Sequence, residues 1–319
     1  MDKTEKAALE KTARKIRCLL MDELGTLGIG HVGGSLSIVD ALTVLYFGKM
    51  KINPKDPTWD ERDRLILSKG HAGPALYAAL AERGYFDRAL LKTLNQPGTS
   101  LPSHCDMRLT TGVDMTAGSL GQGISCAAGI AKALKIKKIP SHVYCIIGDG
   151  ESQEGQVWEA SMAASQLKLD NLTVLLDYNH LQIDGKLEEI NSLENPAARW
   201  KAFGFSVFEA CGHDVEDLAG ALDKALAVKG RPSFIVMHTT KGKGVSFVEQ
   251  AEAANHNMTL SAEQTAQALS ELGAADFLPD GSNAVCRVNQ TGDSKSPDRQ
   301  VFEILCAKRG RLSGAGCGS

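Results

Sequence analysis

The 319-residue sequence lacks paired cysteines, long apolar runs and an excess of basic residues, and each absence excludes a class of protein. Its eight cysteines are scattered without a Cys-x-x-Cys pair, which argues against a structural zinc site and a disulfide framework. No apolar run approaches the roughly 20 residues that span a bilayer, and the N-terminus has the pattern of a charged amphipathic helix rather than a signal peptide. A net charge of −3 gives no basis for binding nucleic acid or an anionic membrane. We therefore predict a cytoplasmic protein.

The residues that are present are typical of a globular protein, with 43% hydrophobic and 23% charged residues. Length alone suggests about two domains, although one large α/β domain also fits. Apolar runs of strand length alternate with helical patterns, which predicts an α/β fold with a doubly wound, mostly parallel sheet and helices on both faces. This pattern ends near residue 274. Residues 275–319 are rich in Gly, Ser, Asn and Asp without apolar periodicity, so we predict a flexible tail there.

The chain is organised around residues 143–185, where two apolar runs each end in polar residues. The run 143–147 leads into Asp149, and the run 172–176 leads into Asn179. A helical pattern separates them, which indicates a strand, a crossover helix and a parallel strand. The carboxyl ends of parallel strands lie at the same edge of a sheet, so the two side chains can converge. A carboxylate, an amide oxygen and a backbone carbonyl suit Mg²⁺ or Ca²⁺ with further positions for phosphate oxygens.

Gly150 follows Asp149 and strengthens the prediction of a phosphate site. Glycine allows close approach of the backbone, and the helix expected behind it offers free N–H groups and a positive dipole end to an anion. Gly-Asp-Gly alone is a common turn, because Asp and Gly are ordinary turn residues. The complete two-strand arrangement therefore carries the prediction of a metal-bridged diphosphate.

Three histidines lie in segments that combine glycine with a change of secondary structure. His31 is in a glycine-rich turn before a helix expected to open near Ser35, and His71 is at a strand-to-helix junction. His104 is in residues 95–123, a stretch without periodicity that exceeds the usual length of a loop in a compact domain. Each has a structural alternative: a histidine bonded to backbone, a helix cap, and a surface excursion. The segment GSLGQG at 118–123 follows no adjacent strand and does not match the Rossmann fingerprint.

Taken together, these motifs resemble those of the transketolase family. The matching segments are GHVGG at 30–34, SKGHA at 68–72, GDGESQEG at 148–155, LDYNHLQIDG at 176–185 and TTKGKGVSF at 239–247. The resemblance covers roughly residues 10–272 and is most specific between 62 and 185. It implies the thiamine diphosphate-binding fold, in the form of the domain that binds the diphosphate, over residues 1–274.

The resemblance also implies roles for individual residues. Asp149, Asn179 and the carbonyl of Leu181 would hold the metal, expected to be Mg²⁺ with Ca²⁺ or Mn²⁺ as alternatives. The residues expected around thiamine diphosphate are His71, Gly118, Leu120, Asp149, Gly150, Glu154 and Asn179, and the expected catalytic histidines are His31, His71, His104 and His256. The family usually has Gly-His-Pro where this chain has Ser103-His104-Cys105. It also places Trp and Gly beside the last histidine, where this chain has Asn255 and Asn257.

The function implied is that of a transferase: the N-terminal subunit of a split transketolase in carbohydrate metabolism, with the pentose phosphate pathway as the expected context. Such an enzyme moves a two-carbon ketol unit from a ketose phosphate to an aldose phosphate. In this family the activating glutamate lies on a second, pyrimidine-binding domain, so a C-terminal partner subunit is expected. Glu154 and Glu159 would face the partner in an α2β2 heterotetramer. The alternatives are a deoxyxylulose-phosphate synthase-like or 2-oxo acid dehydrogenase-like component, and a non-catalytic remnant that binds the cofactor.

Overall fold

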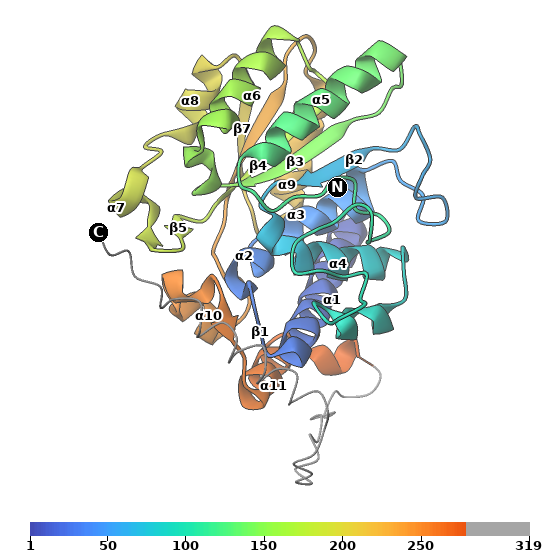
Figure 1. Cartoon of the computed structure of the whole chain (residues 1–319), viewed down its shortest axis with the longest axis vertical. Helices are drawn as coiled ribbons and strands as arrows, with labels where there is room; N and C mark the ends of the chain where they lie inside the picture. Colours follow the sequence, from blue (N-terminus) through green and yellow to red (C-terminus); the bar gives the residue numbers. More distant parts are fainter. Residues whose placement is uncertain (279–319) are drawn as a thin grey trace, which may run out of the picture. The chain divides into compact units, whose positions relative to one another are not determined.

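The computed structural model describes residues 1–278, and from residue 279 on the predicted flexible tail lies outside the described residues. A parallel five-stranded sheet with the strand order β2, β3, β4, β8, β7 forms the centre of this part of the chain (Figure 1). Its strands are β2 (Arg64–Leu67), β3 (Val143–Gly148), β4 (Leu172–Tyr178), β7 (Ser206–Cys211) and β8 (Ser233–His238). The apolar runs that predicted strands therefore form this sheet. The domain boundary predicted at residue 274 stays a prediction.

The strands of the sheet are buried on both faces because their apolar residues alternate between two cores. In β3, Tyr144 and Ile146 pack into one core, whereas Val143, Cys145 and Ile147 pack into the other. Successive side chains of a strand point to opposite faces, so a continuous apolar run supplies both cores at once. A sheet of this kind requires helices on each side.

Helices cover both faces of the sheet, as the sequence predicted (Figure 1). One face carries α1 (Lys3–Leu27), α3 (Val39–Val44), α4 (Gly73–Arg83) and α9 (Val215–Ala227), and the other carries α5 (Gln122–Lys137), α6 (Gly155–Gln166) and α8 (Pro196–Ala202). The shorter helices are α2 (Val32–Leu36), α7 (Leu187–Asn191), α10 (Ser246–Gln250) and α11 (Ala262–Glu271). No helix within residues 1–278 is both long and apolar enough to cross a membrane. The cytoplasmic location stays a prediction.

Local signals set the ends of several helices. Asp2 caps α1 by accepting a hydrogen bond from the backbone N–H of Glu5, and Asp214 caps α9 in the same way. The start of α11 has a complete capping box, in which the side chains of Ser261 and Gln264 each accept from the other's backbone N–H. These caps explain why the sequence placed the starts of α9 and α11 correctly.

The prediction of one helix opening near Ser35 is wrong. The helix α2 begins at Val32 and ends at Leu36, and α3 begins at Val39 after a break at Ser37. The hydroxyl of Ser37 donates to the carboxylate of Asp177 at 2.6 Å and to the carbonyl of Gly34 at 3.1 Å. A tertiary contact thus interrupts the helix, and the apolar periodicity could not indicate it.

Glu23 on α1 is a buried carboxyl group without a visible partner. It is 1% exposed, and neither of its carboxylate oxygens has a hydrogen-bond partner within residues 1–278. Burial, and then the charge of Asp22, raise the pKa of Glu23 well above its ordinary value, against the smaller effect of Lys92. The fold therefore accommodates the protonated form.

We predict that Glu23→Gln reduces the dependence of stability on pH. Because the pKa of Glu23 is higher in the folded than in the unfolded chain, the stabilisation it provides is complete below the ordinary carboxyl pKa and is lost as pH rises through the folded pKa. The free energy of unfolding of the wild type should fall between about pH 5 and pH 7, and that of Glu23→Gln should fall less. Urea denaturation across this range measures both, and parallel curves would contradict the prediction.

Candidate functional site

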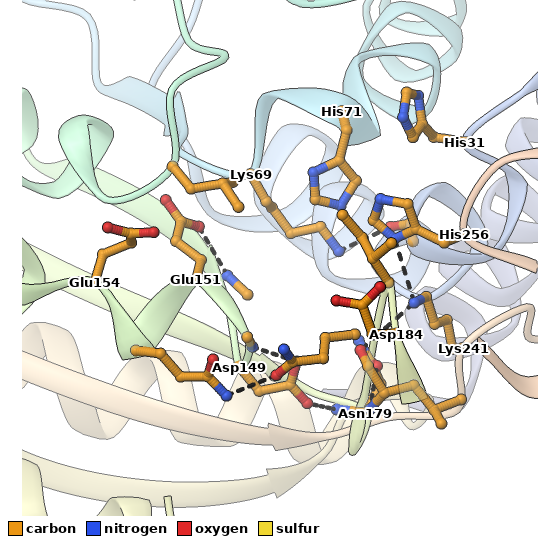
Figure 2. A pocket seen from close by; sticks show the side chains of 18 of the residues that line it. His31, Lys69, His71, Asp149, Glu151, Glu154, Asn179, Asp184, Lys241 and His256 are labelled. Atoms are coloured by element: carbon orange, nitrogen blue, oxygen red, sulfur yellow. Dashed lines mark hydrogen bonds between the residues drawn. The ribbon is translucent and has the colours of Figure 1, made fainter. Parts of the chain in front are cut away.

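A cavity of about 380 Å³ lies at the carboxyl ends of β2, β3 and β4 (Figure 2). Every residue that the sequence predicted for the site lines it: His31, His71, His104, Gly118, Leu120, Asp149, Gly150, Glu154, Asn179, Leu181 and His256. These residues come from separate segments of the chain, and the parallel sheet brings them to one edge. This is the edge at which open α/β sheets bind ligands.

Asp149 and Asn179 meet as the two parallel strands predicted. The backbone N–H groups of Asn179 and His180 donate to Asp149 Oδ2 at 2.9 and 2.6 Å, and the N–H of Leu181 donates to Asn179 Oδ1 at 3.1 Å. His180 has a φ of 64°, a left-handed conformation that is uncommon for residues other than glycine. Burial, followed by the charge of Asp177, raises the pKa of Asp149 to about 6.

The donor set at this position fits a hard cation. Within residues 1–278 no group of three or more His, Cys, Asp or Glu side chains could hold a metal ion. The cavity instead presents the carboxylate of Asp149, the amide of Asn179 and the backbone of Leu181 side by side. Mixed oxygen donors of this type suit Mg²⁺, which usually binds one or two carboxylates together with water and phosphate oxygens.

The approach to Gly150 differs from the expected one. The Gly150 N–H donates to Asp149 Oδ1 at 2.8 Å, and a 3₁₀ turn at Glu151–Gln153 comes before α6. The helix N-terminus therefore does not lie directly behind Gly150. Close packing still explains the glycine, because a Cβ there would lie 3.0 Å from the Cβ of Gln182.

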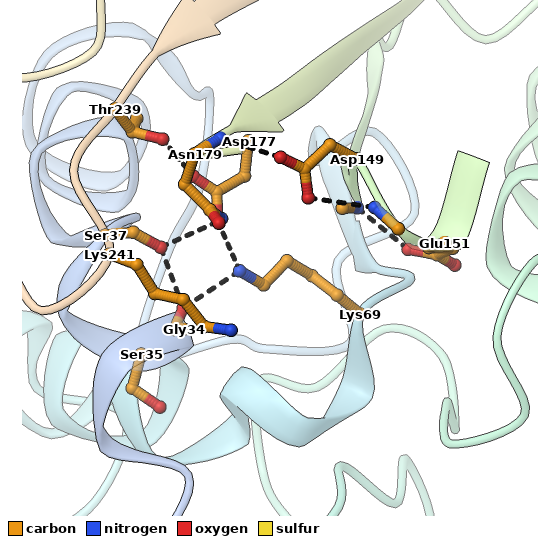
Figure 3. Close-up of polar contacts among 12 residues, drawn as sticks. Gly34, Ser35, Ser37, Lys69, Asp149, Glu151, Asp177, Asn179, Thr239 and Lys241 are labelled. Atoms are coloured by element: carbon orange, nitrogen blue, oxygen red, sulfur yellow. Dashed lines mark hydrogen bonds and ion pairs between the residues drawn. The ribbon is translucent and has the colours of Figure 1, made fainter. Parts of the chain in front are cut away.

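A buried ion pair between Lys69 and Asp177 lies directly beneath the cavity (Figure 3). Asp177 also accepts hydrogen bonds from Ser37 Oγ, Thr239 Oγ1 and Asn179 Nδ2. Burial opposes ionisation of Asp177, but Lys69 and these donors hold its pKa below the ordinary value. Since the amide nitrogen of Asn179 faces Asp177, the amide oxygen is left for the cavity side.

A second buried carboxylate, Glu151, joins three loops of the site. Its Oε1 accepts from the Gly121 N–H at 2.8 Å and from the Ser68 hydroxyl, and its Oε2 accepts from the Gly148 N–H at 3.0 Å. Burial raises the pKa of Glu151, and these hydrogen bonds oppose that shift. The loop GSLGQG is thereby fixed to the ends of β2 and β3.

Four imidazole rings form a cluster on one wall of the cavity. The ring centroid of His31 is 5.5 Å from those of His71 and His104 and 5.3 Å from that of His256. A small antiparallel sheet of β1 (Ile29–Gly30) and β9 (Met258–Thr259) helps to bring His31 and His256 together. Burial lowers the pKa of all four, and that of His256 falls to about 3. Near neutral pH the rings are therefore uncharged and able both to donate and to accept hydrogen bonds.

The loop that carries His104 is anchored at its unusual Cys105. The thiol is 1% exposed, and a Cβ added to Gly73 would lie 3.2 Å from its sulfur. Tyr77 supports the same loop by donating its hydroxyl to the carbonyl of Pro102 at 2.8 Å. Cysteine in place of the usual proline is thus accommodated, and His104 remains in the imidazole cluster.

The unusual neighbour of His256 is also explained by packing. Asn255 is 0% exposed, and its amide donates to the carbonyls of Lys241 at 3.2 Å and Val248 at 2.8 Å. These contacts hold the segment of His256 against the segment of Lys241. The ring of His256 lies 4.9 Å from that of His71, between centroids.

Lys241 is a buried cation that the sequence did not assign to the site. It is 4% exposed and lines the cavity, and its Nζ lies 3.4 Å from both the Leu181 carbonyl oxygen and His256 Nδ1. No carboxylate within residues 1–278 forms a salt bridge with it. Burial, and then the charge of Lys69, lower its pKa to about 8. A buried cation without a partner carboxylate calls for an anion in the cavity.

The sequence reasoning thus missed Lys69, Glu151, Asp177 and Lys241. A signal for two of them was present, since Lys69 lies two positions before His71 and Lys241 follows a predicted strand in a Lys- and Gly-rich turn. Nothing in the local sequence distinguishes Glu151 from the other acidic residues of its turn.

A sequence model described as "Transketolase, thiamine diphosphate binding domain" matches residues 8–285. The chain belongs to the transketolase family. This confirms the predicted family, the predicted fold and the predicted thiamine diphosphate-binding domain.

Two relatives match this transketolase chain along nearly their whole length. The 6-deoxy-6-sulfo-D-fructose transketolase subunit SqwG of Clostridium sp. is 54% identical over 264 residues, which cover 83% of this chain and 96% of the relative. One of the subunits of the apulose-4-phosphate transketolase of Phocaeicola vulgatus is 39% identical over 264 residues, which cover 83% and 93%. The prediction of a transketolase N-terminal subunit is confirmed, whereas the pentose phosphate pathway is not supported by these relatives.

The solved transketolase of Campylobacter jejuni superposes with a TM-score of 0.78 at 34% identity. The superposition covers 86% of this chain but 43% of the Campylobacter chain. This transketolase chain therefore corresponds in extent to the named subunits and to less than half of that longer enzyme.

We predict that Lys69→Met destabilises the cofactor-free chain by about 3–5 kcal/mol, because it leaves the buried carboxylate of Asp177 without its cation. Lys69→Met combined with Asp177→Asn should recover part of that loss, since both charges are then removed. Urea denaturation of the two variants measures the difference. A Lys69→Met single variant as stable as the wild type would show that the ion pair does not hold the site.

Proposed function

We propose that this chain is the diphosphate-binding subunit of a two-chain transketolase that transfers a two-carbon ketol unit with thiamine diphosphate and Mg²⁺. The observation that carries the proposal is the buried, positively charged Lys241 beside the oxygen donors of Asp149 and Asn179. Cations and metal ligands on one wall suit a metal-bridged diphosphate. The match to two named transketolase subunits supports the choice of reaction.

In this proposal the metal is held by Asp149, Asn179 and the carbonyl of Leu181, and the diphosphate lies against Gly150. Lys241 and His71 face the anionic end of the cofactor. Gly118 and Leu120 present backbone to its rings. When bound, thiamine diphosphate supplies the carbon nucleophile that accepts the ketol unit.

The imidazole cluster is the proposed acid–base apparatus. His31, His104 and His256 surround the space next to the cofactor site, and their rings are close enough to contact one small substrate. Neutral imidazoles can bind sugar hydroxyl groups and move protons near neutral pH. His104 is proposed to contact the sugar.

The donor substrate is proposed to be a ketose with an anionic group at its far end. The relatives act, by their names, on a sulfonated ketose and on a ketose phosphate. At 54% identity to the first of them, 6-deoxy-6-sulfo-D-fructose is the donor to test first, followed by ketose phosphates.

The partner is proposed to be a C-terminal subunit that carries the pyrimidine-binding domain, in an α2β2 assembly. Glu154, at the start of α6, lines the cavity, and both Glu154 and Glu159 are exposed within the described chain. Exposed carboxylates at this position are available to a second chain that closes the site.

We predict that Asp149→Ala abolishes Mg²⁺-dependent binding of thiamine diphosphate, because the diphosphate and the metal need the protein carboxylate to complete the metal shell. Calorimetric titration with the partner subunit present measures the affinity. Glu189→Ala, which removes an exposed carboxylate on α7 outside the metal ligands, is the control for general damage. Unchanged affinity in Asp149→Ala would refute the metal assignment.

We also predict that the chain alone has little or no transketolase activity and gains it with the companion subunit. The assay contains thiamine diphosphate, Mg²⁺, 6-deoxy-6-sulfo-D-fructose or a ketose phosphate, and an aldose phosphate acceptor. Release of the shortened aldose product is the measurement. Full activity without a second subunit would refute the two-chain enzyme.

A further inference from the structure

A hydrogen-bonded chain outside the cavity connects the N-terminal helices with the segment that carries Lys241. Arg17 on α1 donates through both terminal nitrogens to the carboxylate of Asp40 on α3. Asp40 Oδ2 is 2.8 Å from Nδ1 of His213, which lies in the turn between β7 and α9. The backbone N–H of Thr240 donates to His213 Nε2 at 2.8 Å. Of these side chains none lines the cavity.

The direction of this chain is defined by its donors. His213 Nε2 accepts from a backbone N–H, so the ring hydrogen is on Nδ1 and is donated to Asp40. Burial opposes ionisation of Asp40, but Arg17 and His213 hold its pKa below the ordinary value. The ionised carboxylate, fixed by Arg17, therefore fixes both the tautomer and the orientation of the His213 ring.

The segment around Lys241 has few other supports. On the cavity side, the Thr239 hydroxyl donates to Asp177. The Gly242 N–H donates to the Gly33 carbonyl at 3.0 Å, and Arg17 Nε donates to the Lys243 carbonyl at 3.2 Å. Gly242 and Gly244 have φ values of 94° and 95°, so the turn depends on glycine and is intrinsically permissive. The hydrogen bond from Thr240 to His213 is the contact next to Lys241 itself.

We propose that His213, held by Asp40 and Arg17, is a positioning residue that aims Lys241 at the cofactor diphosphate. The inference rests on the proposed function. The His213 ring fixes the peptide N–H immediately before Lys241, and the long lysine side chain reaches the cavity only from that backbone position. Losing this contact weakens the binding of thiamine diphosphate although no residue of the cavity wall has changed.

Two amide substitutions separate the two hydrogen bonds of the ring. His213→Gln extends an amide to the position of Nε2 and keeps an acceptor for Thr240, whereas His213→Asn stops near Nδ1 and keeps only the contact with Asp40. Calorimetry of thiamine diphosphate with Mg²⁺, on the full chain with its partner subunit, gives the affinity. We expect about five- to tenfold weaker binding for His213→Asn, consistent with one lost hydrogen bond, and a smaller loss for His213→Gln.

A double-mutant cycle with Lys241→Met decides whether His213 acts through the lysine. In the Lys241→Met background, His213→Asn should produce no further loss of affinity, because there is no cation left to position. Additive losses, or a larger loss in His213→Gln than in His213→Asn, would overturn the inference. If His213→Asn does not fold, Arg17→Lys, which cannot hold Asp40 and the Lys243 carbonyl together, enters the same cycle with the same expectation. A wild type that does not bind thiamine diphosphate would instead contradict the proposed function.

Discussion

The buried ion pair between Lys69 and Asp177 joins the segments that build the site. Both side chains are almost completely excluded from solvent, so separating them would expose each to a large desolvation cost. The same carboxylate accepts from Ser37 and Thr239, and it orients the amide of Asn179. One anion therefore connects the segments after α2, β2, β4 and β8. The loops of the site form a single structure because they share this centre.

The charges around the cavity explain its preference for an anion. Lys69 is neutralised by Asp177, and the charge of Glu151 is occupied by hydrogen bonds from three loops. Lys241 has no carboxylate in salt-bridge contact within residues 1–278 and points into the same space. Asp149 is a further buried carboxylate of the cavity, and burial together with the charge of Asp177 keeps its pKa raised. A metal ion beside Asp149 and an anion beside Lys241 would satisfy both.

The fold was largely predictable, because the residues that bury a parallel sheet are apolar on both faces and stand out as continuous runs. The runs at β3 and β4 indicated the strands, and the capping residues Asp214 and Ser261 indicated helix starts. The errors lie where a distant residue decides the local conformation. Asp177 breaks the helix at Ser37, and the 3₁₀ turn after Gly150 delays the start of α6. No local pattern carries that information.

The order of the amino acids was enough to establish the family, the alternation of strands and helices and the oxygen donors Asp149 and Asn179, because parallel strands place their ends at one edge whatever the details of packing. Which charges are paired and which are free became known from the folded chain. Folding joined His31 to His256 through β1 and β9, neutralised Lys69, and left Lys241 facing the cavity. It also connected Arg17, Asp40 and His213 to the lysine segment. These contacts join residues up to more than 200 positions apart, and their strength depends on burial, which exists only after the chain has folded.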